Sequence, residues 1–316
     1  MSNSLKFYYY LRLYLFTILS NISPNNKLKS HIVIFLKSAF FNIKYSYKNI
    51  FKTNNHINFK YSSGSYWNRC INHLNFVGQY YDHEKIHMSP AINLTVTNIN
   101  YKNRKIEDLS DNLFNNDSLK YNSKIINEIF KDAKYYNILQ WLGTHYYTFS
   151  EKVINIKQLD ICKNSSILDI GPGLSLNSLL YSDLNNKNII FYDLEPMSLI
   201  QKKIENLIRQ KRNINKIEYY NDIYNLEKSL FSKDYILFSS YAFSEFPITL
   251  RKKFEDVIKK SKLSIFLSNN KFENVDNNKY FSEVSKKLQK NLVIKNFEYP
   301  SQDGYTKKHK YFILDN

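Results

Sequence analysis

From about residue 150 onward, short apolar runs alternate with segments whose apolar residues recur every three or four positions. Short apolar runs are typical of buried strands, and the three-to-four spacing is typical of helices packed on one side. The expected strands are 167–170, 188–192, 216–220, 234–240, 263–267, 291–298 and 310–314. This alternation predicts βαβ units, and therefore an α/β fold with a parallel sheet covered by helices.

The helices expected between these strands follow from their apolar stripes. One covers 176–184, one carries Ile200, Ile204, Leu207 and Ile208, one carries Leu250, Phe254, Val257 and Ile258, and one covers 283–290. Only residues 299–309 separate the last two strands, which is too short for the crossover that parallel neighbours need. The sequence therefore predicts an antiparallel hairpin at the end of the sheet.

The first 145 residues have a different pattern. Two short apolar runs, 5–18 and 31–41, are interrupted by basic residues, and the first is too short to span a membrane. No small-residue cleavage site follows it, so no secretory signal peptide is expected. Residues 1–60 are expected to form a basic aromatic helical segment. It either lies on a membrane surface or packs on the main domain. Residues 61–145 are expected to form a cap that shapes a substrate site.

Charge is distributed unevenly along the chain. The formal net charge is +17, and ten Lys and Arg residues precede Asp82, the first acid. More than half of the excess therefore comes from the first quarter of the sequence, which indicates an anionic partner there. The two cysteines, Cys70 and Cys162, argue against a disulfide framework and for a reducing compartment.

One stretch carries the clearest chemistry: the first expected strand ends in Asp169, and Gly171, Gly173 and Ser175 follow. Glycines without a Cβ let the backbone turn sharply and approach a ligand, and the next helix would add free N–H groups. Asp169 would repel the diphosphate that dinucleotide-binding turns hold. The stretch therefore indicates a site for a cationic or hydroxylated ligand, unless it is a turn that binds nothing.

This pattern, apolar-apolar-Asp/Glu-x-Gly-x-Gly-x-Gly, resembles the first motif of class I S-adenosylmethionine-dependent methyltransferases, with Ser175 in place of the third glycine. The resemblance implies S-adenosylmethionine as cofactor, bound by Asp169, Gly171 and Gly173. It also implies a Rossmann-like, seven-stranded class I methyltransferase sheet with an antiparallel C-terminal hairpin. That domain would cover residues 146–316, after a largely helical N-terminal cap region.

Further donor contacts are expected where the next strands end. Asp193 lies 22 residues beyond Gly171, and a carboxylate at about that spacing commonly accepts both hydroxyls of a ribose. In methyltransferases of this class an acid after the third strand often contacts the adenine amino group. Asp222 has that position, although a solvated turn would explain it equally well. Ser239, near the end of the fourth strand, completes the expected donor set.

The loop after the fourth strand runs Ser240-Tyr241-Ala242-Phe243-Ser244-Glu245 and is soon followed by a proline. It is similar to that of a family of bacterial sugar O-methyltransferases, often linked to surface polysaccharide synthesis. Tyr192-Asp193-Leu194 resembles the second-strand ending of the same family. The likeness covers about residues 140–316. It implies that the methyl acceptor is a hydroxyl of a nucleotide-linked or lipid-linked sugar.

A sugar hydroxyl becomes nucleophilic only as its proton leaves, so a base is needed. Glu245 is the first candidate and His309, expected in the hairpin loop, is the second. Glu245 could instead be an acid favoured by the dipole of the following helix. Tyr241, Ser244 and Asp303 are expected substrate contacts. No compact carboxylate cluster indicates a metal site, and metal dependence stays open.

Two other methyl acceptors have known requirements in the loop after the fourth strand. Adenine amino methylation usually needs Asn/Asp-Pro-Pro-Tyr/Phe after the fourth strand, and pyrimidine C5 methylation needs a cysteine there. The sequence has neither. RNA ribose or another small-molecule acceptor stays an alternative, as does a non-catalytic protein that binds membranes or glycans. The expected partners are a sugar or glycan and an anionic membrane touched by residues 1–60, and nucleic acid is not expected. The expected location is the cytoplasm, at the inner membrane face.

Overall fold

The computed structural model describes residues 148–173, 187–272, 274–299 and 307–316. The basic N-terminal segment, the cap, the helix expected over 176–184 and Asp303 lie outside these ranges. The division of the chain at residues 60 and 145 therefore stays a prediction.

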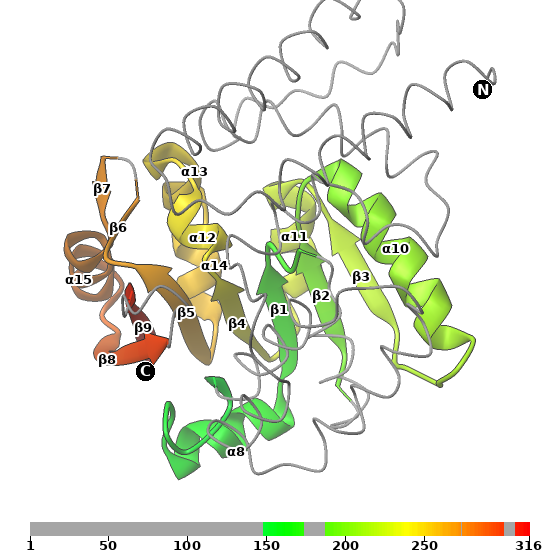
Figure 1. The fold of residues 1–316 in the computed structure, drawn as a ribbon, viewed down its shortest axis with the longest axis horizontal. Coiled ribbons are helices and arrows are strands. Elements are labelled where there is room, and N and C mark those ends of the chain that lie inside the picture. Colours follow the sequence, from blue (N-terminus) through cyan, green and yellow to red (C-terminus); the bar gives the residue numbers. More distant parts are fainter. Residues whose placement is uncertain (1–147, 174–186, 273, 300–306) are drawn as a thin grey trace, which may run out of the picture.

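The described residues form a seven-stranded mixed sheet with the strand order β3-β2-β1-β4-β5-β9-β8 (Figure 1). Its strands are β1 (Ser166–Ile170), β2 (Ile189–Tyr192), β3 (Ile217–Tyr220), β4 (Tyr235–Ser240), β5 (Leu263–Asn269), β8 (Asn291–Tyr299) and β9 (Lys307–Asp315). The first five are parallel, and β9 runs antiparallel to both β5 and β8. The predicted α/β architecture and its antiparallel hairpin are therefore confirmed. A short ribbon of β6 (Lys271–Phe272) and β7 (Val275–Asp276) follows β5.

Helices cover both faces of the sheet, which gives three layers (Figure 1). One face carries α11 (Ile223–Leu230), α13 (Ile248–Lys253), α14 (Glu255–Lys260) and α15 (Asn277–Leu288). The other face carries α8 (Ile156–Asn164) and α10 (Glu195–Arg209). A one-turn helix, α12 (Ala242–Glu245), follows β4 directly. This layering leaves the carboxyl ends of the parallel strands as the edge where the loops after β1, β2 and β4 gather.

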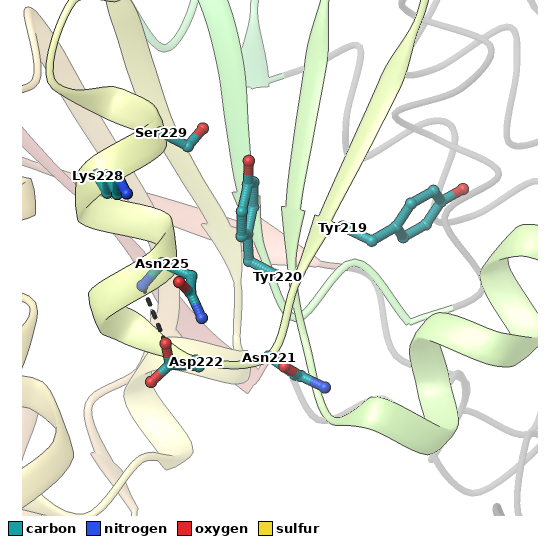
Figure 2. A pocket seen from close by; sticks show the side chains of 7 residues that line it. All are labelled: Tyr219, Tyr220, Asn221, Asp222, Asn225, Lys228 and Ser229. Atoms are coloured by element: carbon teal, nitrogen blue, oxygen red, sulfur yellow. Dashed lines mark hydrogen bonds between the residues drawn. The ribbon is translucent and has the colours of Figure 1, made fainter.

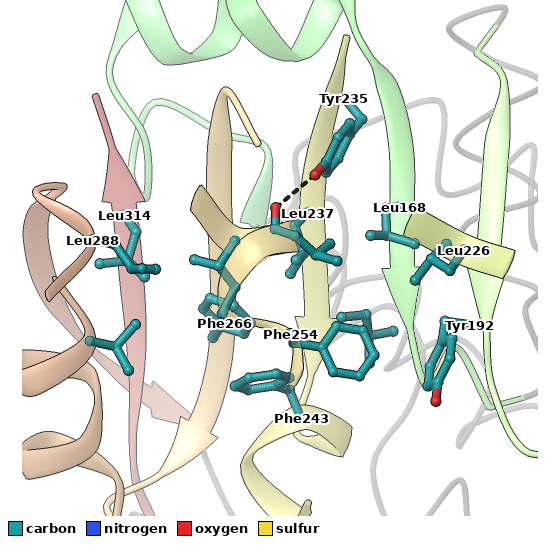
Figure 3. Close-up of a cluster of buried hydrophobic side chains, with 14 of the residues drawn as sticks. Leu168, Tyr192, Leu226, Tyr235, Leu237, Phe243, Phe254, Phe266, Leu288 and Leu314 are labelled. Atoms are coloured by element: carbon teal, nitrogen blue, oxygen red, sulfur yellow. Dashed lines mark hydrogen bonds between the residues drawn. The ribbon is translucent and has the colours of Figure 1, made fainter. Parts of the chain in front are cut away.

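Two apolar clusters hold the layers together. The first core cluster lies under α11 and α13–α15 and contains Phe243, Phe254 and Phe266 (Figure 3). The Tyr235 hydroxyl is buried in it and donates to the Val257 carbonyl at 2.7 Å. The second core cluster lies on the opposite face of the sheet, where α8 contributes Cys162. Each fully buried large apolar side chain stabilises the fold by about 2 kcal/mol.

The helices differ from the sequence prediction in several places. The helix predicted over 283–290 is α15, which begins six residues earlier, because Asp276 accepts from the Lys279 backbone N–H and starts the helix in a polar segment. The helix predicted through Phe254 is broken there into α13 and α14. Helices α8 and α11 and the short α12 were not predicted. His309 lies within β9 rather than in the hairpin loop, because the strand begins at Lys307.

Candidate functional site at the carboxyl edge of the sheet

The glycine turn after β1 uses its two glycines differently. Gly171 has φ +66°, and its N–H donates to the Tyr192 carbonyl at 2.9 Å. A Cβ at this position would lie 2.1 Å from the Ala242 Cβ. Gly173 also has a positive φ, +58°, but a Cβ there would meet no atom within 4 Å. Gly171 is therefore the point where the ends of β1 and β2 and the start of α12 come into contact.

Asp193 follows β2 and is held beside that turn. Its Oδ1 accepts from the Leu194 backbone N–H at 2.8 Å, and its Oδ2 accepts from Gln201 Nε2 at 2.7 Å. The same Gln201 nitrogen donates to the Gly173 carbonyl at 2.9 Å. The structure therefore brings together Gly173 and Asp193, two residues predicted to bind one ligand. It joins them through Gln201, a residue that the sequence analysis missed.

Burial shifts the titration of Asp193. Loss of hydration raises its pKa to about 7, although hydrogen bonds from Leu194, Gln201 and Gly173 act in the opposite direction. Near neutral pH this carboxyl therefore exists in both protonation states. Asp169, the acid before the glycine turn, is 2% exposed on β1, in register with Phe191 and Phe238.

Asp222 is the N-cap of α11: its Oδ2 accepts from the Asn225 backbone N–H at 2.9 Å. It is exposed and lines a pocket of about 480 Å³ around the edge strand β3 (Figure 2). Tyr219 and Tyr220 project from opposite sides of that strand. The predicted contact of Asp222 with adenine stays a prediction, and the structure adds a capping role that explains its position.

A fixed polar network lies beside this pocket. Glu218 accepts from Tyr220, from Ser229 and, at 2.7 Å, from the Lys233 ammonium. Burial alone would raise the pKa of Glu218, but the hydrogen bonds from Lys233 and Tyr220 outweigh it and hold the pKa below its ordinary value. Glu218 therefore stays ionised and holds β3 against the end of α11.

Ser239 ties the end of β4 to its neighbours. Its hydroxyl donates to the Ile170 carbonyl at 2.8 Å and accepts from the Phe243 backbone N–H at 3.0 Å. The side chain is 1% exposed. Ser239 thus joins the last residue of β1 to α12. Its predicted role in binding the donor stays a prediction beside this structural one.

The side chains of Tyr241, just after β4, and His309, near the start of β9, contact each other. Tyr241 follows β4 with φ +65° and ψ −38°, a backbone conformation that a residue with a side chain rarely adopts, and its N–H donates to the Leu267 carbonyl. Its ring contacts the His309 imidazole edge to face, with centroids 5.3 Å apart. His309 is 8% exposed and pairs with Asn269 at the end of β5. Backbone strain of this kind is often found at functional sites.

The loop after Tyr241 carries the other predicted residues. Ser244 Oγ donates to the Tyr241 carbonyl at 2.6 Å, which closes the turn of α12. Glu245 is the last residue of α12 and is partly exposed. It precedes α13, which begins at Ile248, so it belongs to a separate short helix. The structure therefore places Glu245 one turn beyond the Tyr241–His309 pair.

Arg251 anchors this loop, and the sequence analysis missed it. Its guanidinium is fully buried and donates to the carbonyls of Ser244 and Phe246, the two residues that flank Glu245. A third bond, at 2.8 Å, reaches Asn277 Oδ1 on α15. Burial lowers the pKa of Arg251 to about 10, which leaves it charged at neutral pH. The guanidinium carbon also lies 4.8 Å from the Tyr280 ring centroid.

Asn277 extends this anchor to β5. Its Nδ2 donates to the Asn269 carbonyl at 2.8 Å, and its backbone N–H donates to Asn270. Because Asn269 pairs with His309, one chain of hydrogen bonds and strand pairing runs from the loop of Glu245 to the strand of His309. One feature of the sequence could have revealed Arg251: it lies within the buried helical stripe of Leu250, Phe254 and Ile258.

No family model matches the sequence, and no curated protein matches it. Among solved structures, it is similar to magnesium protoporphyrin IX methyltransferase (ChlM) from Synechocystis PCC 6803 with bound SAM, with 10% identity and TM-score 0.40, covering 69% of this chain and 100% of that one. It is also similar to the methyltransferase domain of bacterial CtHen1, with 12% identity and TM-score 0.41, covering 51% and 95%. A precorrin-6y C5,15-methyltransferase from Geobacter metallireducens GS-15 gives 12% identity and TM-score 0.34, covering 52% and 91%.

The strand order and register identify the fold. Five parallel strands in the order β3-β2-β1-β4-β5, with an antiparallel strand inserted between β5 and β8, define the class I methyltransferase fold. Within the described ranges, no helix has the length and apolar character needed to cross a membrane. In the same ranges, no three His, Cys, Asp or Glu side chains gather as metal ligands.

Proposed function

We propose that this protein is an S-adenosylmethionine-dependent O-methyltransferase that acts on a sugar hydroxyl. The observation that carries the proposal is the joined glycine turn and Asp193 at the carboxyl edge of β1 and β2. Ligands of open α/β sheets bind at this edge, where the strand order reverses. In the strand order of this sheet, that reversal falls between β1 and β4.

The residues at the turn fit a nucleoside donor. Gly171 and Gly173 leave the turn free of side chains, so a ligand can approach its backbone. Asp193, when ionised, accepts hydrogen bonds from two adjacent ribose hydroxyls. Asp169 provides a carboxyl two residues before Gly171, and in its ionised form such a group suits a sulfonium cation. When bound, S-adenosylmethionine supplies a methyl group whose C–S bond breaks as a new C–O bond forms.

On the acceptor side, the protein must take up the hydroxyl proton. We assign this role to Glu245 or His309, which lie after β4 and within β9. The proton of the acceptor hydroxyl passes to the carboxylate or the imidazole as the new bond forms, which leaves a neutral ether. Tyr241 offers an aromatic ring beside His309 on which a sugar face can stack.

The sugar acceptor is the finer part of the proposal. It is supported by the resemblance of residues 240–245 and 192–194 to bacterial sugar O-methyltransferases. An RNA ribose or another small-molecule hydroxyl is the alternative acceptor, and a non-catalytic glycan-binding role is the alternative from a different class. The two experiments below separate these possibilities.

The donor site is tested by titrating the purified full chain with S-adenosylhomocysteine in a calorimeter. Wild type is expected to bind with a micromolar dissociation constant, and Asp193→Ala at least about tenfold more weakly, because two hydroxyl hydrogen bonds are lost. Asp160→Ala, an exposed acid on α8, is the matched control and should bind like wild type. A well-folded wild type that does not bind would remove the methyltransferase proposal.

The acceptor is tested by transfer of radioactive methyl from S-adenosylmethionine to a panel of nucleotide sugars and to RNA. Incorporation into a sugar, with rates reduced about a hundredfold or more in the variant of the true base, is expected. Glu245→Gln and His309→Gln identify that base, since only one should flatten the pH profile. Incorporation into RNA alone would replace the sugar proposal with its alternative.

We also propose that residues 1–60 bind an anionic membrane. This binding would place the protein at the inner face of the cytoplasmic membrane. The charge excess and apolar runs of that segment support it. Cosedimentation with vesicles containing phosphatidylglycerol, compared with pure phosphatidylcholine, measures it. Binding to the anionic vesicles that falls with added salt is expected, and equal partition to both would contradict the proposal.

A further inference from the structure

Gln201 lies in the second turn of α10 and is completely buried, yet its side chain is polar. It shares the inner face of that helix with Met197, Ile204 and Ile208, all of which are buried and apolar. From this face the amide nitrogen reaches the Gly173 carbonyl and the Asp193 carboxylate. The side chain thus spans two segments that lie 28 and 8 residues before it in sequence.

The direction of the amide follows from its partners. A carbonyl and a carboxylate oxygen both accept, so the NH₂ end of Gln201 must face them. Its two hydrogens are then used, one for each partner. The opposite end, Oε1, is buried and has no hydrogen-bond partner among the described residues. Buried acceptors are seldom left without a partner. The two bonds that the Gln201 NH₂ group donates therefore explain why an amide stands here, although its Oε1 makes no hydrogen bond to the described residues.

Both bonds act on the proposed donor site. The bond to Gly173 fixes the second residue of the turn with positive φ, and the bond to Asp193 Oδ2 fixes the plane of the carboxylate. Leu194 holds the other carboxylate oxygen, so the two donors together set the direction of both oxygens. A ribose needs a carboxylate in one fixed orientation, because its two hydroxyls are rigidly spaced.

We propose that Gln201 is a positioning residue for the methyl donor: it locks the glycine turn to Asp193 and so presents the carboxylate to the ribose hydroxyls. This inference rests on the proposed function. Its electrostatic consequence is that the donated N–H favours ionised Asp193, the form that accepts from hydroxyls. Among the described residues, the other ionisable groups at this edge include Asp169 on β1, Glu195 in the first turn of α10, Asp222 at the start of α11, Glu245 on α12, and the phenols of Tyr192, Tyr220 and Tyr241.

The test compares wild type with Gln201→Met, which keeps the length and volume of the side chain but donates no hydrogen bond. S-adenosylhomocysteine is titrated between pH 5.5 and 8.5. At pH 7 the variant is expected to bind about tenfold more weakly. The pH at which affinity reaches half its maximum should also be higher, because Asp193 needs a higher pH to ionise. Gln210→Met, the same change at the exposed end of α10, should leave both quantities unchanged.

A double-mutant cycle with Asp193→Asn separates positioning from general stability. If Gln201 acts mainly through Asp193, Gln201→Met should weaken binding much less in Asp193→Asn than in wild type. Additive losses, or an unchanged pH midpoint, would overturn the proposal. Should Gln201→Met fail to fold, Gln201→Asn, which is one methylene too short to span both acceptors, takes its place.

A measurement on the ligand-free protein tests the role of Gln201 separately from the proposed function. The carboxyl carbon of Asp193 can be titrated by NMR in protein labelled with ¹³C at aspartate. A higher pKa in Gln201→Met than in wild type supports the lock even if S-adenosylhomocysteine does not bind, in which case only the donor assignment fails. Equal pKa values in the two proteins would overturn the role of Gln201.

Discussion

At the residue scale, the site depends on backbone positions whose positive φ favours glycine. Gly171 is restricted both by its positive φ and by the nearness of Ala242, whereas Gly173 is restricted by φ alone. Tyr241 departs from this rule, because it holds a positive φ with a large side chain. The two glycines can therefore be separated by experiment, although they look equivalent in the sequence.

We predict that Gly171→Ala destabilises the fold by about 3 kcal/mol, because left-handed backbone strain adds to overpacking against Ala242. Gly173→Ala should cost only about 1 kcal/mol, since strain is its sole penalty. Urea unfolding followed by circular dichroism measures both. Equal losses in the two variants would mean that the turn relaxes away from α12.

A second prediction concerns Asp193 and pH. Its pKa, about 7 when folded, lies above the ordinary value of 3.8, so the folded state binds the extra proton between those two pH values. The contribution of Asp193 to stability is therefore fully present below pH 4 and is lost as the pH rises to 7. Asp193→Asn, which imitates the protonated acid, should match wild type near pH 4 and exceed its stability by about 4 kcal/mol at pH 8. Unfolding free energies of both proteins across this range decide it, and a constant difference would contradict the shifted pKa.

At the scale of elements, α12, α13 and α15 are held together by one buried cation. Arg251 donates to the carbonyls of Ser244 and Phe246 and to Asn277, so its removal leaves three acceptors without that partner. The carbonyls on both sides of Glu245 are among them. The position of the proposed base therefore depends on a side chain from the helix that follows it.

We predict that Arg251→Met destabilises the protein by about 3 kcal/mol, because buried acceptors lose their donors. Arg251→Lys should recover less than half of that loss, since one ammonium cannot reach three acceptors in different directions. Lys252→Met, the exposed neighbour on the same helix, should change stability by no more than about 0.5 kcal/mol. Chemical unfolding of the three variants gives the comparison, and a stable Arg251→Met would show that the loop does not need this anchor.

The elements also show which features the sequence could predict. Strands such as β1 and β4 were placed within a residue of their observed starts, because central parallel strands are buried on both faces and appear as continuous apolar runs. Helix α15 was placed too late, because its first turn is polar and is set by the Asp276 cap. The glycine turn was found from local spacing. Gln201 and Arg251 were missed because the segments that they join, Gly173 with Asp193 and the loop of Glu245 with Asn277, come together only in the folded chain, although each is a polar residue in an apolar helical stripe.

At the scale of the whole molecule, the second core cluster joins α8 to β1, β4, β5 and β9. Cys162 lies in it, 1% exposed, and burial raises the pKa of its thiol to about 12. At pH 8 only about one molecule in ten thousand would carry the thiolate. The thiol can therefore react only when this part of the core opens.

We predict that in a Cys70→Ser protein a disulfide reagent labels Cys162 at least about a thousandfold more slowly at pH 8 than in 6 M guanidinium chloride. The labelling rate should rise with added denaturant as steeply as unfolding itself. A rate that does not respond to low denaturant would indicate that α8 opens alone, without the sheet.

The place of β9 between β5 and β8 has a consequence for synthesis on the ribosome. β9 begins about forty residues after β5, so at the usual pace of translation, 5–20 residues per second, β5 waits roughly two to eight seconds for its neighbour. Throughout that interval the nascent chain exposes the unpaired edge of Leu263–Asn269, a strand whose side chains are almost all destined for burial. An edge of this kind invites pairing with other chains. Loss of newly made protein to aggregation should therefore begin at β5, and slower translation of the segment between β5 and β9 should increase it.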